Sequence, residues 1–253
     1  MAREKFRQKS ISGMRASPGP SPGMDVGRST PAWGALGACA PTTRARLETA
    51  ALPLEHPAGA PIAIAGASAE GILLLSQGVV RIFHALSPDR QFTVKLLRTP
   101  TVLGVIEVTQ SSPWVASAEA LSPTEGYVIP APVFREALSM DHGFTTAVLT
   151  DLAASFAGTI RVSRAMGFDK CEQRLIRVLL EYAEHFGRAS EEGLVIRYPL
   201  SRQRLALEIG AARRSVDRVL ADLTAEKLLS LSAKGWQVLH APGELRSRLL
   251  TPG

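Results

Sequence analysis

The residues best suited to chemistry in this chain are arginines in a short segment near the carboxyl end. Residues 201–223 read Ser-Arg-Gln-Arg-Leu-Ala-Leu-Glu-Ile-Gly-Ala-Ala-Arg-Arg-Ser-Val-Asp-Arg-Val-Leu-Ala-Asp-Leu. Arg213 and Arg214 are followed about one helical turn later by Arg218. A planar guanidinium group matches the O6 and N7 acceptors of guanine in the major groove of DNA. This spacing therefore suggests recognition of bases and phosphates rather than catalysis.

Two helices that meet through a tight turn would position these arginines. Such a motif needs a small residue where the helices approach, a glycine in the turn and apolar residues that face inward. Ala206 and Gly210 meet the first two needs, and Ser201 is placed to cap the first helix, where its hydroxyl and the free N–H groups could also hold a phosphate. The inward-facing set is Leu205, Ile209, Val216, Val219 and Leu220. The pattern predicts a helix-turn-helix.

Two alternating segments, 228–232 and 235–239, follow this motif and predict a β-hairpin. A hairpin after a helix-turn-helix is a wing, and Lys234 at its tip would lie near DNA phosphates. Trp236 is expected to pack rather than to stack on a base. An alternative stays open, in which Asp217 and Asp222 form surface ion pairs with the arginines and the segment is an ordinary solvated helix.

The segment from about residue 47 to 135 predicts a domain of short antiparallel strands. Strands at this spacing, without helices between them, indicate a sandwich or barrel. The expected strands are 72–75, 79–83, 92–97, 115–118 and 127–129, with turns at 77–78 and 87–90.

Over about residues 144–166 the apolar residues recur with the period of an α-helix. Residues at alternating steps of four and three form the seam of a coiled-coil helix, namely Val148, Leu152, Ser155, Thr159, Val162 and Met166, widened by Phe144, Phe156 and Ile160. This helix either pairs with its copy in a second chain, which we favour, or packs on its own β domain. Gly167 is expected to act as a hinge, and a second helix is expected over 172–185, followed by a loop.

Composition and charge limit the class of protein. The chain has 253 residues, of which 45% are hydrophobic and 21% charged, as in a globular protein of one or two domains. Residues 1–46 carry eight basic and two acidic side chains, residues 47–167 seven and ten, and residues 168–253 fourteen and eleven. Basic ends favour a polyanionic partner. Residues 1–42 are rich in Pro and Gly without a period and predict a disordered basic tail.

The residues of catalytic and metal sites do not gather anywhere in the sequence. Cys39 and Cys171 lie far apart, whereas a structural zinc site needs about four clustered ligands. No nucleophile elbow or phosphate-cradling glycine loop occurs. No apolar run approaches the ~20 residues that cross a bilayer, and no signal peptide is visible. We therefore expect no enzyme activity, no cofactor, no metal, no membrane partner and a cytoplasmic location.

The order of a β domain, a long helix and a winged helix-turn-helix resembles the cyclic-AMP receptor/fumarate–nitrate regulator (Crp/Fnr) family of bacterial transcription factors. The resemblance covers about residues 55–240 and is strongest over 201–239. It implies an α+β fold with an N-terminal antiparallel β-roll, similar to a cyclic-nucleotide-binding domain, then a dimerisation helix and a C-terminal winged helix-turn-helix. The corresponding boundaries are 43–138 for the β-roll, 139–167 for the helix and hinge, 168–243 for the DNA-binding domain and 244–253 for a C-terminal tail.

The resemblance implies a homodimer that binds double-stranded DNA at an operator with two-fold symmetry, and RNA polymerase as a further partner through about residues 185–194. In the family a Thr or Ser, an Arg and a Gln open the first helix, and the recognition set is commonly Arg-Glu-Thr/Ser-Val-x-Arg. Arg214 replaces the acid of that set, so the operator is expected to depart from the usual half-site. The expected DNA-binding residues are Ser201, Arg202, Gln203, Arg213, Arg214, Ser215, Arg218 and Lys234.

The implied effector pocket departs further from the family. Cyclic-nucleotide binders place Gly-Glu-Leu ahead of Arg-Ser-Ala, because a cyclic phosphate needs a guanidinium group. This chain has Gly104-Val105-Ile106 and Ser111-Ser112-Pro113 there, so both the arginine and the glutamate are missing. The remaining pocket residues by resemblance are Gly104, Glu107 as a substitute acid, Ser111, Ser112 and Thr159. We expect that cyclic AMP is not bound in the usual way.

Two alternatives stay open at this point. The effector could be another nucleotide, such as a cyclic dinucleotide, an unknown small molecule or none. The chain could also be a ligand-binding signalling protein whose C-terminal domain contacts protein, and it would then show no salt-dependent binding of any duplex.

Overall fold

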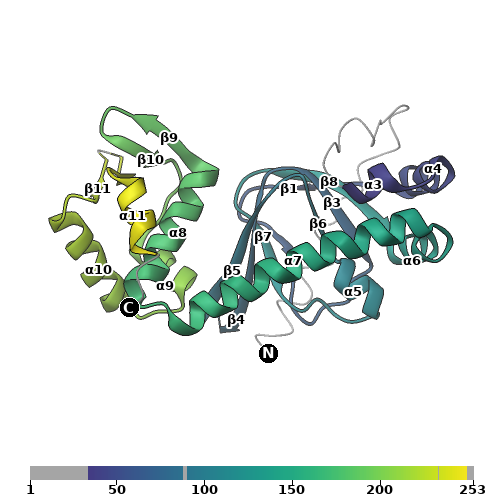
Figure 1. Cartoon of the computed structure of the whole chain (residues 1–253), viewed down its shortest axis with the longest axis horizontal. Coiled ribbons are helices and arrows are strands. Elements are labelled where there is room, and N and C mark those ends of the chain that lie inside the picture. The colour runs from purple at the N-terminus through teal and green to yellow at the C-terminus, as the bar shows by residue number, and fades with distance from the viewer. Residues whose placement is uncertain (1–33, 88–89, 233, 250–253) are drawn as a thin grey trace. The chain divides into compact units, whose positions relative to one another are not determined.

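The structure is a computed structural model that describes residues 34–87, 90–232 and 234–249. The chain divides into two compact units, the first formed by residues up to 81 with 97–154, and the second by 82–96 with residues from 155 onward. Helices and antiparallel sheets occur in the order that the α+β prediction requires (Figure 1). Helix α7, His142–Phe168, is continuous from the first unit into the second.

Two four-stranded sheets form the β-roll, and the expected strands are confirmed with small shifts of their ends. One sheet has the order β1-β8-β3-β6, from Leu52–His56, Thr124–Pro130, Gly71–Gln77 and Thr101–Leu103. The other has the order β2-β7-β4-β5, from Pro61–Ala63, Ser117–Ala120, Val79–Ser87 and Arg90–Arg98. Gly78 turns the chain between β3 and β4 with a φ of 116°, which side chains other than glycine rarely adopt. The turn at 88–89 lies outside the described residues.

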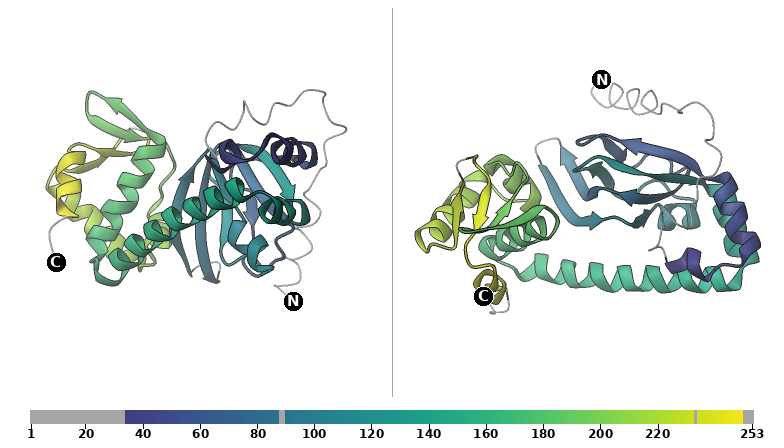
Figure 2. Two further views of the ribbon diagram at one scale, coloured as in Figure 1. Left: turned by 45° about the vertical axis from the view of Figure 1, so that its right-hand side comes forward. Right: turned by 90° about the horizontal axis from the view of Figure 1, so that it is seen from above.

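The core of the first unit lies between the β1-β8-β3-β6 sheet and a layer of helices. These helices are α3 (Gly34–Ala38), α4 (Pro41–Ala50), α5 (Val105–Gln110), α6 (Ala131–Met140) and the beginning of α7. Ile72 and Leu74 of β3 face them, and the rings of Phe134 and Phe144 meet edge to face with centroids 5.9 Å apart. Figure 2 shows α3, α4 and α6 beside the amino-terminal part of α7. Helices α5 and α6 were not expected from the sequence.

The prediction of a tail through residue 42 is wrong from residue 34 onward. Helices α3 and α4 belong to the core, where Ala35, Leu36 and Cys39 are buried. The backbone N–H of Ala40 donates to Asp141 Oδ2 at 2.7 Å, and Arg44 Nη2 donates to the carbonyl oxygen of Leu36 at 2.6 Å. These contacts come from parts of the chain outside the segment, which explains why its own composition did not indicate them. Residues 1–33 of the predicted tail lie outside the described residues.

Two details of the predicted dimerisation helix also need correction. Phe144 and Val148 are buried in the core of their own unit, so the first part of the seam packs as an ordinary domain helix. Among the α7 residues whose side chains are described, the exposed large apolar ones are Leu149 and Phe156, at 60% and 67%. The predicted seam residues Val162 and Met166 lie outside the described side chains. Gly167 lies inside the helix, which ends at Phe168, and therefore does not break it.

The second unit contains helices that pack beside a four-stranded sheet. Helix α8, Cys171–Phe186, leads into β9 (Gly187–Ser190) and β10 (Gly193–Ile196), so the loop expected there is an antiparallel hairpin. The sheet has the order β11-β12-β10-β9, completed by Leu229–Leu231 and Gln237–Leu239. The predicted C-terminal tail is wrong at its start, because α11, Pro242–Arg248, is helical and buries Leu245.

Candidate nucleic-acid interface

The helix-turn-helix is present with the expected turn. Helix α9, Arg202–Ile209, ends at Gly210, whose φ of 61° lies in the left-handed region, and α10 begins at Arg213 and ends at Ala225. The backbone N–H of Ala211 donates to the carbonyl oxygen of Ala206 at 3.0 Å and closes the turn. A glycine is favoured at this position because it takes a left-handed conformation without steric cost.

Ser201 caps α9 as the sequence predicts. Its Oγ accepts a hydrogen bond from the backbone N–H of Arg204 at 3.1 Å, which satisfies one of the donors left free at a helix start. Ala206, the predicted small residue, is buried. The predicted inward-facing set is buried as well, namely Leu205, Ile209, Val216, Val219 and Leu220. This core fixes which side of α10 is left for solvent.

The exposed side of α10 carries the predicted arginines. Arg213, Arg214 and Arg218 are exposed, and Ser215 is half-buried between them. Within the described part of the chain, Arg214 and Arg218 have no carboxylate partner, whereas Arg213 lies 3.8 Å from Asp217. The alternative of surface ion pairs therefore applies to Arg213 only, and two guanidinium groups stay available at the surface.

The first turn of α9 lies beside these arginines through a shared acid. Arg202 Nη1 donates to Asp217 Oδ1 at 3.2 Å, so the start of α9 and the first turns of α10 are joined at the surface. Gln203 is exposed next to Arg202. The structure therefore brings Arg202 of α9 and Arg213 of α10 to the same carboxylate at the surface of the motif.

The wing hairpin carries two cations on one aromatic ring. Lys234 is exposed, and its Nζ lies 5.4 Å from the centroid of the Trp236 ring. Arg197, which follows β10, lies 5.9 Å from the same centroid. Trp236 is half-buried and packs, as the sequence predicts. Arg197 was missed by the sequence analysis, because only the pairing of β10 with β12 brings it next to the wing.

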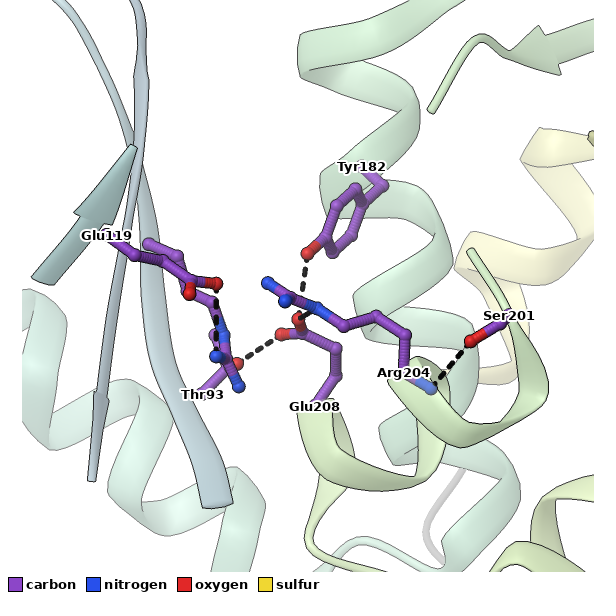
Figure 3. Close-up of polar contacts among 7 residues, drawn as sticks. Thr93, Glu119, Tyr182, Ser201, Arg204 and Glu208 are labelled. Carbon is purple, nitrogen blue, oxygen red and sulfur yellow. Dashed lines mark hydrogen bonds and ion pairs between the residues drawn. The ribbon is translucent and has the colours of Figure 1, made fainter. Parts of the chain in front are cut away.

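A buried carboxylate organises the other side of α9. Glu208 is 1% exposed and accepts hydrogen bonds from Tyr182 Oη at 2.8 Å and Arg204 Nε at 2.5 Å (Figure 3). Thr93 Oγ1 also donates to Glu208. Burial raises the pKa of the Tyr182 hydroxyl, which therefore stays protonated and remains a donor. Three donors on one carboxylate fix the rotation of α9, and no sequence pattern indicated this site.

A second acid of this unit, Glu181 on α8, accepts the backbone N–H of Leu96 at 2.7 Å. Its pKa is raised from the ordinary value of 4.5 to about 7, mainly by burial and to a smaller extent by the neighbouring Glu208 and Glu184. The hydrogen bond from Leu96 and the charge of Lys95 act in the opposite direction. Glu181 is therefore a carboxyl group that the fold keeps partly protonated near neutral pH.

Glu181 predicts a stability that falls as the pH rises. Between about pH 4.5 and 7 the folded state binds more protons than the unfolded state, so the free energy of unfolding declines over that range and is then constant. The decline is expected to reach about 2 to 3 kcal/mol. Glu181→Gln should remove most of it, as measured by urea unfolding at pH 5 and pH 8 with circular dichroism. An equal decline in both proteins would show that Glu181 is not its source.

The first unit also contains an ion pair whose arginine is fully buried and whose glutamate is partly exposed. Arg81 on β4 is 0% exposed, and its Nη1 lies 3.2 Å from Oε1 of Glu119 on β7. A buried arginine needs such a partner, because an uncompensated charge in the interior is very costly. Neither residue was predicted from the sequence.

Four of the five predicted effector residues, all except Thr159, lie in or beside α5. Gly104 precedes α5 with a φ of 88°, and Glu107 within α5 is buried and accepts the backbone N–H of Val115 at 3.2 Å. Ser111 and Ser112 end the same helix, where the backbone N–H of Ser112 donates to the carbonyl oxygen of Glu107 at 2.9 Å. Thr159 belongs to the second unit, and its hydroxyl donates to the carbonyl oxygen of Ser155 at 3.1 Å.

An arginine missed by the sequence analysis approaches the end of α5. Arg135 Nη1 on α6 donates to the carbonyl oxygen of Val108 at 3.2 Å and lies 3.5 Å from Ser111 Oγ. A guanidinium group is thus present beside the loop, although on a different element from the arginine of cyclic-nucleotide binders. Among the described residues no group of three or more potential metal ligands occurs.

Comparison with known proteins agrees with this architecture. The model of the cyclic nucleotide-binding domain matches residues 53–141, and that of the Crp-like helix-turn-helix domain matches residues 173–248. The global nitrogen regulator of Synechococcus elongatus is 29% identical over 178 residues, which cover 70% of this chain and 80% of the relative.

Two solved structures share the fold. A putative transcriptional regulator of the Crp/Fnr family from Eubacterium rectale superposes with a TM-score of 0.72 at 17% identity, covering 88% of this chain and all of the other. The c-di-GMP responsive global regulator CLP of Xanthomonas campestris superposes with a TM-score of 0.67 at 20% identity, covering 79% and 98%. No helix of the described residues is both long and apolar enough to cross a membrane. Both domain types follow one another in a single chain, which therefore belongs to the Crp/Fnr family of transcription regulators.

Proposed function

We propose that this regulator acts as a homodimer that binds a DNA operator of two-fold symmetry through its winged helix-turn-helix. The observation that carries the proposal is the exposed arginine cluster in the first turns of α10, on the side opposite the buried core of the motif. In helix-turn-helix proteins these turns enter the major groove. Arg213, Arg214 and Arg218 would read bases there.

The surrounding polar residues would fix the orientation of the protein on the duplex. Ser201, Arg202 and Gln203 at the start of α9 and Ser215 on α10 would contact sugar and phosphate, as would Lys234 on the wing. Such contacts provide most of the affinity and no direct sequence information. Arg197 lies on the same tryptophan ring as Lys234 and would add a further phosphate contact.

Helix α7 supports the proposal of a dimer. Leu149, Ala153 and Phe156 are exposed at steps of four and three residues and so lie on one side of the helix. An apolar stripe of this kind is typical of a helix that pairs with a second copy. Two subunits would then present their recognition helices to successive major grooves about 34 Å apart.

Phe156→Asp is expected to convert the dimer into a monomer. Removing one buried phenylalanine from each subunit costs about 3 to 6 kcal/mol of association, which weakens the dimer a hundredfold or more. Analytical ultracentrifugation at micromolar concentration measures the change. Ala154→Asp adds the same charge at an exposed position on another side of α7 and should leave the dimer intact. A dimeric Phe156→Asp protein would assign the interface elsewhere.

The effector is proposed to differ from cyclic AMP bound in the family's usual way. The loop after α5 carries Ser111 and Ser112 where the resemblance implies a phosphate-clamping arginine, and the one guanidinium group described beside it, that of Arg135, already donates to a carbonyl oxygen. Contact of residues 185–194 with RNA polymerase stays a prediction.

Selection of binding sites from random duplexes, followed by footprinting, tests the proposed function. We expect a two-fold symmetric site whose binding constant falls linearly with salt on logarithmic axes, by a slope of about 0.9 for each phosphate contacted. A selected site without symmetry would contradict the dimeric reading. Failure to enrich any duplex would contradict DNA binding itself.

A further inference from the structure

An acidic residue stands in the middle of the proposed DNA-binding surface. Asp217 lies on α10, one turn after Arg213 and one residue before Arg218. Its Oδ1 accepts Arg202 Nη1 at 3.2 Å, and its Oδ2 lies 3.8 Å from Arg213 Nε. Each carboxylate oxygen thus faces a different arginine, one from each helix of the motif.

We propose that Asp217 is a specificity-determining residue, which lowers the affinity for unrelated DNA more than the affinity for the operator. This inference rests on the proposed DNA-binding function and adds a role for a residue that the DNA-binding set did not contain. The partner is the same duplex DNA, and the property that Asp217 affects is the ratio of the affinity for the operator to the affinity for random sequence.

A random duplex encounters mainly the charges of the DNA-binding surface. Binding to unrelated DNA depends almost entirely on cations that replace counterions at phosphates. Asp217 is one-third exposed and offsets one positive charge at the point where Arg202 and Arg213 converge. In the described part of the chain Arg214 and Arg218 have no such partner. Only part of the cationic surface is therefore fully available to phosphates.

With an operator, Arg213 can contact a base and not only phosphates. The shortest approach of Asp217 to Arg213 is through Nε, at 3.8 Å, and not through either of the two terminal nitrogens. Those two nitrogens are donors that can reach guanine O6 and N7 together, and a bidentate contact of this kind forms only with the correct base. Asp217 therefore holds Arg213 in an orientation suited to a base edge and disfavours its loose contact with phosphates.

A purely structural role does not account for this arrangement. Both arginines are more than half exposed, and ion pairs between exposed side chains add little to stability. The residues that fix α9 and α10 to each other are the buried apolar ones described above. The consequence of the two ion pairs is accordingly expected in DNA binding and not in folding.

The test compares Asp217→Asn with Asp222→Asn, in the full-length protein, by fluorescence anisotropy with the selected operator and with a random duplex. Asp222 lies on the same helix, is exposed and has no ion-pair partner among the described residues, so its change removes the same charge without removing the bridge. For Asp217→Asn we expect binding of the random duplex to tighten about tenfold at 0.1 M salt, with a salt slope steeper by about 0.9. Operator binding should change less than threefold.

Three further outcomes decide the inference. Asp217→Glu keeps the charge and should retain the wild-type ratio of operator affinity to random-duplex affinity. A loss of that ratio would count against the role of the ion pairs with Arg202 and Arg213. Equal tightening by Asp217→Asn and Asp222→Asn, or equal effects on both duplexes, would overturn the inference and leave the proposed function intact. If the wild-type protein binds no duplex in a salt-dependent way, the proposed function fails and the inference with it.

Discussion

Arg218→Ala is expected to remove most of the discrimination between the operator and unrelated DNA. Arg218 is exposed one turn into α10, and its guanidinium group has no carboxylate partner in the described part of the chain. A bidentate contact to a base is worth about 1 to 3 kcal/mol, and a dimer makes it twice. We therefore expect operator affinity to fall roughly thirtyfold or more, measured by competition between labelled operator and unlabelled random duplex.

A matched control separates this effect from the loss of one positive charge. Arg246 on α11 is as exposed as Arg213 and pairs with Glu184 of α8 at 3.6 Å, so this ion pair involves neither helix of the helix-turn-helix. Arg246→Ala should lower the affinity for both duplexes slightly and equally. If Arg218→Ala leaves the preference for the operator unchanged, α10 does not read bases through this residue.

Glu208→Ala is expected to have the largest effect on stability. The change leaves the hydroxyl of Tyr182, the guanidinium group of Arg204 and the hydroxyl of Thr93 without the acceptor that they share in the interior. Removing one partner from a buried charged pair costs about 3 to 5 kcal/mol. Urea unfolding followed by circular dichroism should show the loss directly.

Two comparisons make this stability prediction specific. Glu208→Gln keeps an acceptor oxygen and should lose clearly less stability than the alanine variant. Glu191→Ala, at an exposed acid in the β9–β10 turn, should change the free energy of unfolding by less than about 0.5 kcal/mol. Equal stability of wild type and Glu208→Ala would mean that the three donors find water or other acceptors.

The helix-turn-helix could be predicted because its determinants are local. Gly210 must adopt a left-handed conformation, Ala206 must be small, and Ser201 must accept an N–H, and all three lie within ten residues of one another. Inward-facing positions follow from the helical period alone. The strands of the β-roll were predicted for the same reason, since short stretches of sequence determine their lengths and turns.

The sites that were missed depend on contacts between distant residues. Glu208 and Thr93 are 115 positions apart, and no sequence period indicates that an acid will be buried by such a neighbour. Helix α3 reads as a Gly-rich segment, yet its few apolar side chains fill a space formed by β3, α6 and α7. The composition of a segment shows how much apolar surface that segment carries. It does not show which distant elements provide a surface against which these side chains can pack.

The seam of α7 shows a third kind of limit. Phe144 and Val148 have the spacing of a coiled-coil seam, but they are used by the core of their own unit. A helix with one apolar face toward its own core and a second apolar face toward solvent shows a single combined pattern in the sequence. Only the burial of each residue shows to which face it belongs. Leu149 and Phe156, which the separation leaves exposed, are therefore more informative about a partner helix than the full pattern was.

The indole ring of Trp236 is an intrinsic fluorescence probe on the wing. Its indole lies in contact range of Lys234 and Arg197, and positive charges near an indole influence its emission. A phosphate that draws either cation away from the ring alters that electrostatic environment without any attached dye. Titration of the unlabelled protein with DNA can consequently be followed in intrinsic fluorescence, as a change in the part that Trp236 adds to the emission of Trp33 and Trp114.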